Sequence, residues 1–136
     1  MGLRVYVVED SAIVFDRLQE LLHEQGVQVV GHSDTAATAI VEIAALRPDV
    51  VVVDIALREG TGFHVLKALG EPTDPRGPAR VVLTNFNRDW YRDAAKRLGV
   101  EHFFDKSYQI PDLMKVLHAM ALPTGGESGP PLPLPI

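Results

Sequence analysis

The chain has 136 residues, a formal net charge of −5 and no cysteine, and 46% of its residues are hydrophobic. This length suits one domain, and the composition is ordinary for a globular protein. The acidic balance argues against direct DNA or RNA binding, and the missing cysteines exclude disulfides and thiol chemistry. No apolar stretch approaches the ~18 residues of a membrane-spanning helix, and no signal peptide precedes Leu3. We therefore expect a cytoplasmic protein without membrane insertion.

Strand and helix signals alternate from Leu3 to about residue 121. Leu3–Val8 is a nearly continuous apolar run, which predicts a strand covered on both faces. Ser11 is a plausible N-cap of the helix that follows, and Gly26 marks where that helix stops. Val27–Gly31 is the second predicted strand.

The middle of the chain continues the alternation. The second helix is predicted to begin at Asp34 or Thr35 and to end around Pro48, because proline cannot continue the hydrogen-bond ladder. Val50–Val53 is a run of valines and gives the clearest signal of a buried strand. A short third helix is expected over Phe63–Leu69.

The second half of the chain adds two more strand–helix pairs. The prolines and glycine of Glu71–Pro78 predict a long loop before a strand at Arg80–Leu83. A helix is expected over Asp89–Leu98 and a strand over Val100–Phe104. Pro111 suits the start of a fifth helix.

Five strands alternating with five helices predict a single α/β domain, a doubly wound five-stranded parallel sheet with helices on both faces. Periodicity does not determine the strand order, and the flavodoxin-like order 2-1-3-4-5 is an expectation. We assign residues 1–121 to this domain. Residues 122–136 are rich in proline and glycine and are predicted to be a disordered tail. The favoured interpretation of this tail is a linker left from a lost output domain. The alternative is a polyproline II segment that binds a partner.

Charged and hydroxyl residues follow four of the predicted strands. Glu9 and Asp10 come after the first, Asp54 after the third, Thr84 after the fourth and Lys106 after the fifth. The carboxyl ends of parallel strands lie along one edge of a sheet, where open α/β sheets bind ligands. Three carboxylates, a hydroxyl and an ammonium suit Mg²⁺ and a phosphoryl group, with Asp54 as the central member.

Three of these residues also have a plainer explanation when taken alone. A pair of acidic residues that caps the following helix explains Glu9 and Asp10 equally well. Lys106 as a surface lysine is the minority interpretation, because it follows a buried strand. The five histidines are scattered without metal-ligand spacing and are assigned to the surface, which argues against zinc.

Taken together and in this order, these residues resemble the receiver domain of response regulators in two-component signalling. The segment Asp54–Leu66, with Gly60 and Gly62, is similar to the one that follows the family's phospho-accepting aspartate. The resemblance extends from Leu3 to about Met120.

The resemblance implies a role for each site residue. Asp54 is the implied phosphoacceptor, which receives a phosphoryl group from a histidine kinase or a histidine phosphotransfer protein in a phosphorelay. Lys106 and Thr84 are implied to bind the phosphoryl oxygens. The implied cofactor is Mg²⁺ or Mn²⁺, with ligands from Glu9 (partly through a water), Asp10, Asp54 and the backbone carbonyl of Ala56.

A conformational readout is implied as well. Thr84 is expected to move toward the phosphoryl group and Phe103 to move inward behind it. The output surface is then the face formed by the fourth helix, the fifth strand and the fifth helix, which meets an unknown downstream protein. Trp90 and Tyr108 are its candidate aromatic residues, with interface and packing weighed evenly for Trp90.

Two residues bear on the lifetime of the phosphorylated state. Ala56 and Phe86 stand two positions after Asp54 and Thr84, where the family's residues flank the attacking water. Neither side chain can orient that water through a hydrogen bond, and Phe86 can shield the acyl phosphate. We therefore predict slow self-dephosphorylation.

Three other positions depart from the usual pattern of the family. Arg58 replaces a common proline and is expected to loosen its loop, and Asn85 replaces a smaller residue and is expected to narrow access to Asp54. Ser107 replaces the proline that follows Lys106. A cis bond before a non-proline residue costs ~2.5–4 kcal/mol, so the state of the Lys106–Ser107 bond is left open.

The leading prediction is a single-domain response regulator that signals by protein–protein contact. We expect a self-phosphorylating phosphoacceptor with weak autophosphatase activity rather than a conventional enzyme. The alternative is a scaffold domain with the receiver fold that acts without phosphorylation. A third class, an α/β enzyme that binds nucleotide or flavin, is disfavoured because no glycine-rich phosphate loop follows the first strand.

Overall fold

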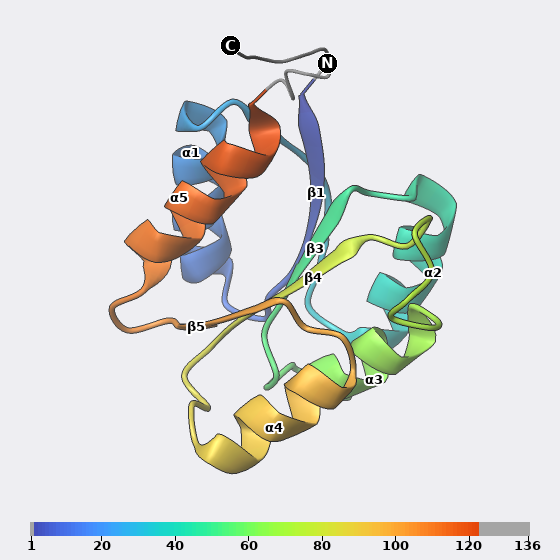
Figure 1. Cartoon of the computed structure of the whole chain (residues 1–136). Coiled ribbons are helices and arrows are strands. Elements are labelled where there is room, and N and C mark those ends of the chain that lie inside the picture. The colour runs from blue at the N-terminus through green and yellow to red at the C-terminus, as the bar shows by residue number, and fades with distance from the viewer. Residues whose placement is uncertain (1, 123–136) are drawn as a thin grey trace, which may run out of the picture.

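The computed structural model describes residues 2–122, in which five strands alternate with five helices (Figure 1). The strands are β1 (Leu3–Val8), β2 (Val27–Ser33), β3 (Val50–Val53), β4 (Ala79–Thr84) and β5 (His102–Asp105). The helices are α1 (Ala12–Glu24), α2 (Ala36–Leu46), α3 (Gly62–Ala68), α4 (Asp89–Arg97) and α5 (Ile110–Ala121).

All strand pairs are parallel, and the order of the sheet is β2-β1-β3-β4-β5. The predicted fold class and strand order are therefore confirmed. The register aligns Val8 with Val53, and Thr84 with Asp105. Because β1 ends level with β3 and β4 ends level with β5, the residues at and after these strand ends come together at one edge of the sheet.

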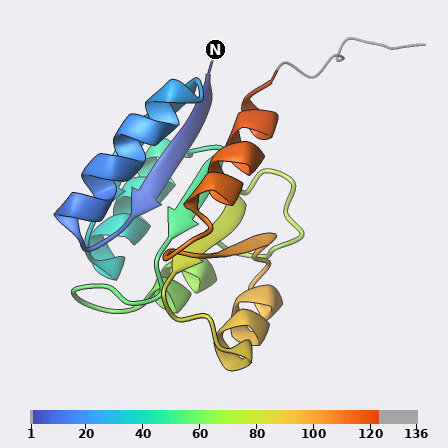
Figure 2. The same cartoon turned by 90° about the vertical axis from the view of Figure 1, so that its left-hand side faces the viewer.

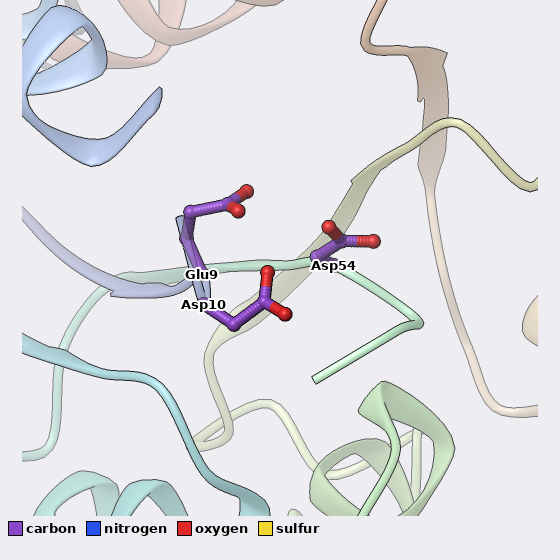
Figure 3. A group of neighbouring side chains, drawn as sticks. All are labelled: Glu9, Asp10 and Asp54. Atoms are coloured by element: carbon purple, nitrogen blue, oxygen red, sulfur yellow. The ribbon is translucent and has the colours of Figure 1, made fainter. Parts of the chain in front are cut away.

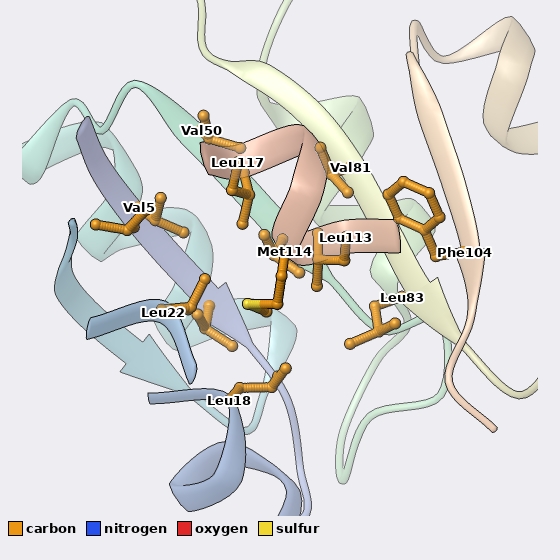
Figure 4. Packing of buried hydrophobic residues seen from close by; sticks show 13 residues of the cluster. Val5, Leu18, Leu22, Val50, Val81, Leu83, Phe104, Leu113, Met114 and Leu117 are labelled. Atoms are coloured by element: carbon orange, nitrogen blue, oxygen red, sulfur yellow. The ribbon is translucent and has the colours of Figure 1, made fainter. Parts of the chain in front are cut away.

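Helices cover both faces of the sheet. Figures 1 and 2 show α1 and α5 on one face and α2, α3 and α4 on the other. On the first face, leucines of α1 and α5 pack over β1, β3 and β4 (Figure 4). Val50 and Val52 join this cluster, whereas Val51 and Val53 belong to the cluster beneath α2 and α3. The valine run is thus buried on both sides, as predicted.

The predicted caps of the first two helices are confirmed, whereas several strand boundaries differ from the predicted ones by one or two residues. Ser11 caps α1, since its side chain accepts a hydrogen bond from the Val14 amide at 3.2 Å. Thr35, and not Asp34, caps α2. β2 extends to Ser33 because Gly31, His32 and Ser33 pair with Tyr6, Val7 and Val8 of β1, after a register shift that skips Val30. β5 begins only at His102, after the turn that follows α4.

The last helix ends at Ala121, which is where the predicted domain ends. Apart from Leu122, the predicted tail lies outside the described residues, so its disorder stays a prediction. No helix in the described part of the chain combines the length and the apolar character that a membrane span requires.

Candidate functional site

Three carboxylates meet at the carboxyl edge of the sheet. Glu9 and Asp10 follow β1, and Asp54 follows β3, its neighbour in the sheet. One carboxylate oxygen from each residue lies within 4.8 Å of the others. Figure 3 shows the side chains of Glu9 and Asp10 extending from the end of β1 toward the side where Asp54 lies. Glu9 and Asp54 are buried, whereas Asp10 is exposed. Strand order alone therefore gathers the acidic residues that the sequence separates.

Asp54 is held by groups from three elements. The Thr84 hydroxyl at the end of β4 donates to Asp54 Oδ1 at 2.6 Å, and the Ala56 amide donates to the same oxygen at 3.2 Å. Lys106 Nζ, which follows β5, donates to Oδ2 at 2.5 Å. The carboxylate is only 5% exposed, so these donors replace the water that it lacks.

Lys106 lies between two buried carboxylates. Its ammonium is 2.5 Å from Asp54 Oδ2 and 2.9 Å from Glu9 Oε1. Burial by itself lowers the pKa of Lys106, but its hydrogen bonds to Asp54 and Glu9 outweigh burial and raise that pKa. The lysine is therefore a fixed positive charge beside Asp54.

Glu9 is the most deeply placed acid of the group. The Ser11 amide donates to Glu9 Oε2 at 3.0 Å, and Lys106 binds its other oxygen. Burial raises the pKa of Glu9 despite these two contacts. Three carboxylates against one ammonium leave an excess of negative charge. The all-oxygen donor set suits a hard divalent cation such as Mg²⁺, which Glu9, Asp10 and Asp54 are placed to hold.

The family model of the response regulator receiver domain matches residues 5–118. The chain belongs to the receiver domain family. It is 31% identical over 115 residues to the transcriptional regulatory protein PdtaR of Mycobacterium tuberculosis. This alignment covers 84% of this chain and 54% of PdtaR. It is 25% identical over 121 residues to the chemotaxis protein CheY of Thermotoga maritima, and this alignment covers 89% of this chain and 99% of CheY.

Solved structures of receiver domains share the fold. The response regulator domain of Thermotoga maritima CheB aligns with a TM-score of 0.77 and 22% identity, over 88% of this chain and 96% of that one. The receiver domain of RcsB from Salmonella enterica, in the presence of the phosphomimetic BeF₃⁻, aligns with a TM-score of 0.75 and 24% identity, over 88% of each chain. The chain spans about half the length of PdtaR, so the module it shares with that relative is the receiver domain.

Two residues that depart from the receiver pattern contact each other. Ser107 Oγ donates to Asn85 Oδ1 at 3.0 Å. The Ser107 amide also donates to Asp105 Oδ1 at 2.7 Å, and the peptide bonds of the described residues, Lys106–Ser107 included, are trans. Lys106 reaches Asp54 with this backbone geometry.

The loop around Arg58 is not loosened, contrary to expectation. Arg58 Nε donates to Asp34 Oδ2 at 2.9 Å, and its backbone amide donates to the Asp34 carbonyl at 3.2 Å. Arginine therefore supplies contacts to the β2–α2 loop that a proline lacks, because proline has no amide proton and no charge.

The residues predicted for output differ in exposure and in the neighbours that they meet. Trp90 and Tyr108 are 65% and 73% exposed. The Trp90 ring meets Phe63 of α3 edge-on at 6.2 Å, so it faces α3. Phe103 is half-buried beneath the Arg92 guanidinium, which lies 4.6 Å from the ring centroid, and the adjacent Phe104 points into the core on the opposite face.

The sequence does not reveal the roles of two residues, one beside Glu9 and one buried in β4. His32 is half-buried: its ring stacks on Phe15 with the ring centroids 3.7 Å apart, and its Nε2 lies 2.8 Å from the Glu9 carbonyl oxygen. Arg80 is only 3% exposed, and its guanidinium donates to the carbonyls of Leu98 and Gly70 at 2.8 and 3.0 Å. No spacing signal marks either residue, because their partners are backbone atoms or rings distant in sequence.

Proposed function

We propose that this receiver domain accepts a phosphoryl group on Asp54 from a histidine kinase or a histidine phosphotransfer protein and signals by protein–protein contact. The observation that supports this best is the setting of Asp54. Its two oxygens are bound by Thr84 and Lys106 at 2.6 and 2.5 Å, beside two further carboxylates. The proposal includes a cytoplasmic location and a role for Mg²⁺ or Mn²⁺.

The transfer itself uses Asp54 as the nucleophile. A carboxylate oxygen of Asp54 bonds to phosphorus while the bond between phosphorus and the donor's imidazole nitrogen breaks and the imidazole leaves. Lys106 stays beside the new acyl phosphate and neutralises a phosphoryl oxygen. When bound by Glu9, Asp10, Asp54 and the Ala56 carbonyl, the divalent ion neutralises charge on the phosphoryl group.

Thr84 connects this chemistry to the rest of the domain. Its hydroxyl donates to Asp54 before phosphorylation, and it is free to redirect that hydrogen bond to a phosphoryl oxygen. The loop after β4 then follows Thr84, and Phe103 repacks in the space behind it. In this proposal Tyr108 belongs to the α4–β5–α5 output face, and the changed face is what a downstream protein recognises.

Beryllofluoride tests the proposal, because BeF₃⁻ mimics a phosphoryl group on aspartate. Trp90 is the only tryptophan of the chain and reports on the β4–α4 region. We expect its fluorescence to change when Mg²⁺ and BeF₃⁻ are added together. The change should disappear in Asp54→Asn and persist in the matched control Asp16→Asn, which alters an exposed carboxylate on α1.

Phosphoryl transfer is tested directly with a phosphorylated histidine phosphotransfer protein. We expect hydroxylamine-labile phosphate to appear on the wild type and not on Asp54→Asn. No labelling, together with no response to BeF₃⁻, would overturn the proposal in favour of a scaffold that acts without phosphorylation.

A further inference from the structure

A groove lies between α3 and α4, apart from the phosphoacceptor site. Its cavity measures about 340 Å³. Its lining comprises Phe63, Lys67, Trp90, Ala94, Arg97 and Leu98. Residues four apart lie on the same face of a helix, so the two α3 residues form one wall and the α4 residues the other.

At its aromatic end, the groove is lined by Phe63 and Trp90, which belong to a row of aromatic rings in contact that continues to Tyr91 and Phe86. The ring of Phe86 lies 5.4 Å from that of Tyr91, Tyr91 lies 4.7 Å from Trp90, and Trp90 lies 6.2 Å from Phe63. Trp90 is 65% exposed and Phe86 43% exposed. Exposed aromatic residues that gather in one patch are typical of protein interfaces.

The charges along this groove have one sign. Lys67 and Arg97 line it, and no carboxylate does. Both side chains are exposed, and among residues 2–122 neither makes an ion pair. Since the whole chain has a net charge of −5, this is a basic site on an acidic protein. Charge complementarity therefore favours an acidic occupant with an apolar side chain for the space beside Trp90.

Arg80 fixes the other end of the groove. Its guanidinium donates to the carbonyls of Leu66 and Gly70, in and just after α3, at 3.5 and 3.0 Å, and to the carbonyl of Leu98, just after α4, at 2.8 Å. The carboxyl ends of both helices are thus tied together by a buried cation. The aromatic end is held by ring packing, so it is the end at which the width of the groove can change.

That aromatic end is connected to Asp54 by two hydrogen bonds. The amide of Phe86 donates to Thr84 Oγ1 at 3.2 Å, and the Thr84 hydroxyl donates to Asp54 Oδ1 at 2.6 Å. When Thr84 moves toward a group bound on Asp54, it carries the backbone of Phe86 with it. The contact between Phe86 and Tyr91 passes this movement to Trp90.

We propose that the α3–α4 groove is a docking site for an acidic segment of a partner protein, which inserts a large apolar side chain beside Trp90. Phosphorylation of Asp54 alters the affinity of the groove for this segment through Thr84 and Phe86. This effect of phosphorylation rests on the phosphoacceptor function proposed above. A single-stranded nucleic acid also uses aromatic and cationic residues, but it needs a longer basic track along its backbone than Lys67 and Arg97 provide.

Binding is measured by fluorescence anisotropy of a dye-labelled helical peptide. The probe has Phe and Leu at helical spacing on one face and glutamate elsewhere. Its matched control has lysine for every glutamate, and a labelled oligo-dT is the third probe. We expect only the acidic peptide to bind. Equal binding of the lysine peptide or of oligo-dT would overturn the inference.

Variants then locate the site. Trp90→Ala should weaken binding about thirtyfold, as expected for a central aromatic anchor. Lys67→Glu combined with Arg97→Glu should weaken it about tenfold, because both contacts become repulsive. The control Lys115→Glu reverses an exposed charge on α5 and should leave affinity unchanged. Unchanged affinity in the groove variants would overturn the inference.

BeF₃⁻ and Mg²⁺ test the connection with Asp54, and ¹⁹F NMR reports separately whether BeF₃⁻ is bound. We expect peptide affinity to change severalfold when BeF₃⁻ binds, and this response to disappear in Phe86→Ala. Bound BeF₃⁻ without any peptide binding overturns the docking site and leaves the phosphoacceptor function intact. Peptide binding without bound BeF₃⁻ supports the docking site and counts against the phosphoacceptor function.

Discussion

Ser107 Oγ donates a hydrogen bond of 3.0 Å to Asn85 Oδ1, and so joins the loop after β5 to the loop after β4. Each residue directly follows a side chain that binds Asp54: Asn85 follows Thr84, and Ser107 follows Lys106. Both residues depart from the usual receiver pattern. The two departures therefore form one contact, which links the loops that carry the proposed phosphoryl-binding groups.

Breaking this contact should speed phosphorylation by a small donor such as acetyl phosphate. The bond lies between loops that have to adjust when Asp54 is phosphorylated, and a hydrogen bond of this kind contributes about 1 kcal/mol. We expect Asn85→Ala and Ser107→Ala each to raise the rate by up to about fivefold, measured through Trp90 fluorescence.

The double variant decides whether the contact is the cause. Since each single variant removes the same hydrogen bond, Asn85→Ala combined with Ser107→Ala should react no faster than either one. Gln19→Ala, an exposed change on α1, serves as the control. Additive effects, or slower reaction in the single variants, would count against the role of this bond.

The fold and the gathering of the site residues follow from the sequence for a physical reason. A strand buried on both faces has to be apolar along its whole length, so the valine run that contains Val52 is visible without a structure. Parallel strands also end at the same edge, so a polar residue directly after each strand joins the same site. Asp54, Thr84 and Lys106 were predicted on this basis, and the structure brings them into contact.

Other features depend on packing that sequence patterns do not report. Arg80 begins a predicted strand as an ordinary charged residue, yet it is buried because carbonyls after two helices converge on it. The sequence predicts Trp90 on a face that includes α5, whereas in the structure its ring meets Phe63 of α3. Helical periodicity shows which residues share a face, but not which neighbour that face meets.

Replacing Lys106 with methionine should destabilise the domain in the absence of divalent cations. Glu9 and Asp54 are 2% and 5% exposed, and the variant leaves both carboxylates without their ammonium partner. Breaking a buried ion pair costs about 3 kcal/mol, which urea unfolding in EDTA measures. Mg²⁺ should stabilise Lys106→Met more than the wild type, because a cation then supplies the only positive charge there.

Lys115→Met is the matched control for that experiment. It removes an exposed ammonium from α5 and should change neither the unfolding free energy nor its response to Mg²⁺. If Mg²⁺ stabilised neither the wild type nor Lys106→Met, the result would contradict the assignment of Glu9, Asp10 and Asp54 as a cation site.

The phosphorylated protein should lose its phosphate slowly. Ala56 carries only a methyl group beside Asp54, and the amide of Phe86 is anchored to Thr84. An asparagine at 56 or a glutamate at 86 can hydrogen-bond the attacking water, which is worth about tenfold in rate. We expect Ala56→Asn and Phe86→Glu to shorten the half-life of the phosphoprotein in Mg²⁺ once the donor is removed. Phe86→Leu preserves the apolar cover and should not shorten it, and a wild type that decays as fast as the asparagine variant contradicts the prediction.

Tyr6 is fully buried in β1, and its hydroxyl donates to Glu42 Oε1 at 2.6 Å. Tyr6→Phe should lower the unfolding free energy by about 2 kcal/mol, which is the contribution of a hydrogen bond to a charged group.

Burial and the hydrogen bond to Glu42 raise the pKa of Tyr6 above its ordinary value of 10.0, so the tyrosine ionises at a lower pH in the unfolded chain than in the folded one. The stabilisation is therefore fully present below pH 10.0 and is lost as pH rises above it. Urea unfolding at about pH 8 and about pH 11 should show the difference between wild type and Tyr6→Phe narrowing at the higher pH. Tyr108→Phe, an exposed control, should match the wild type at both.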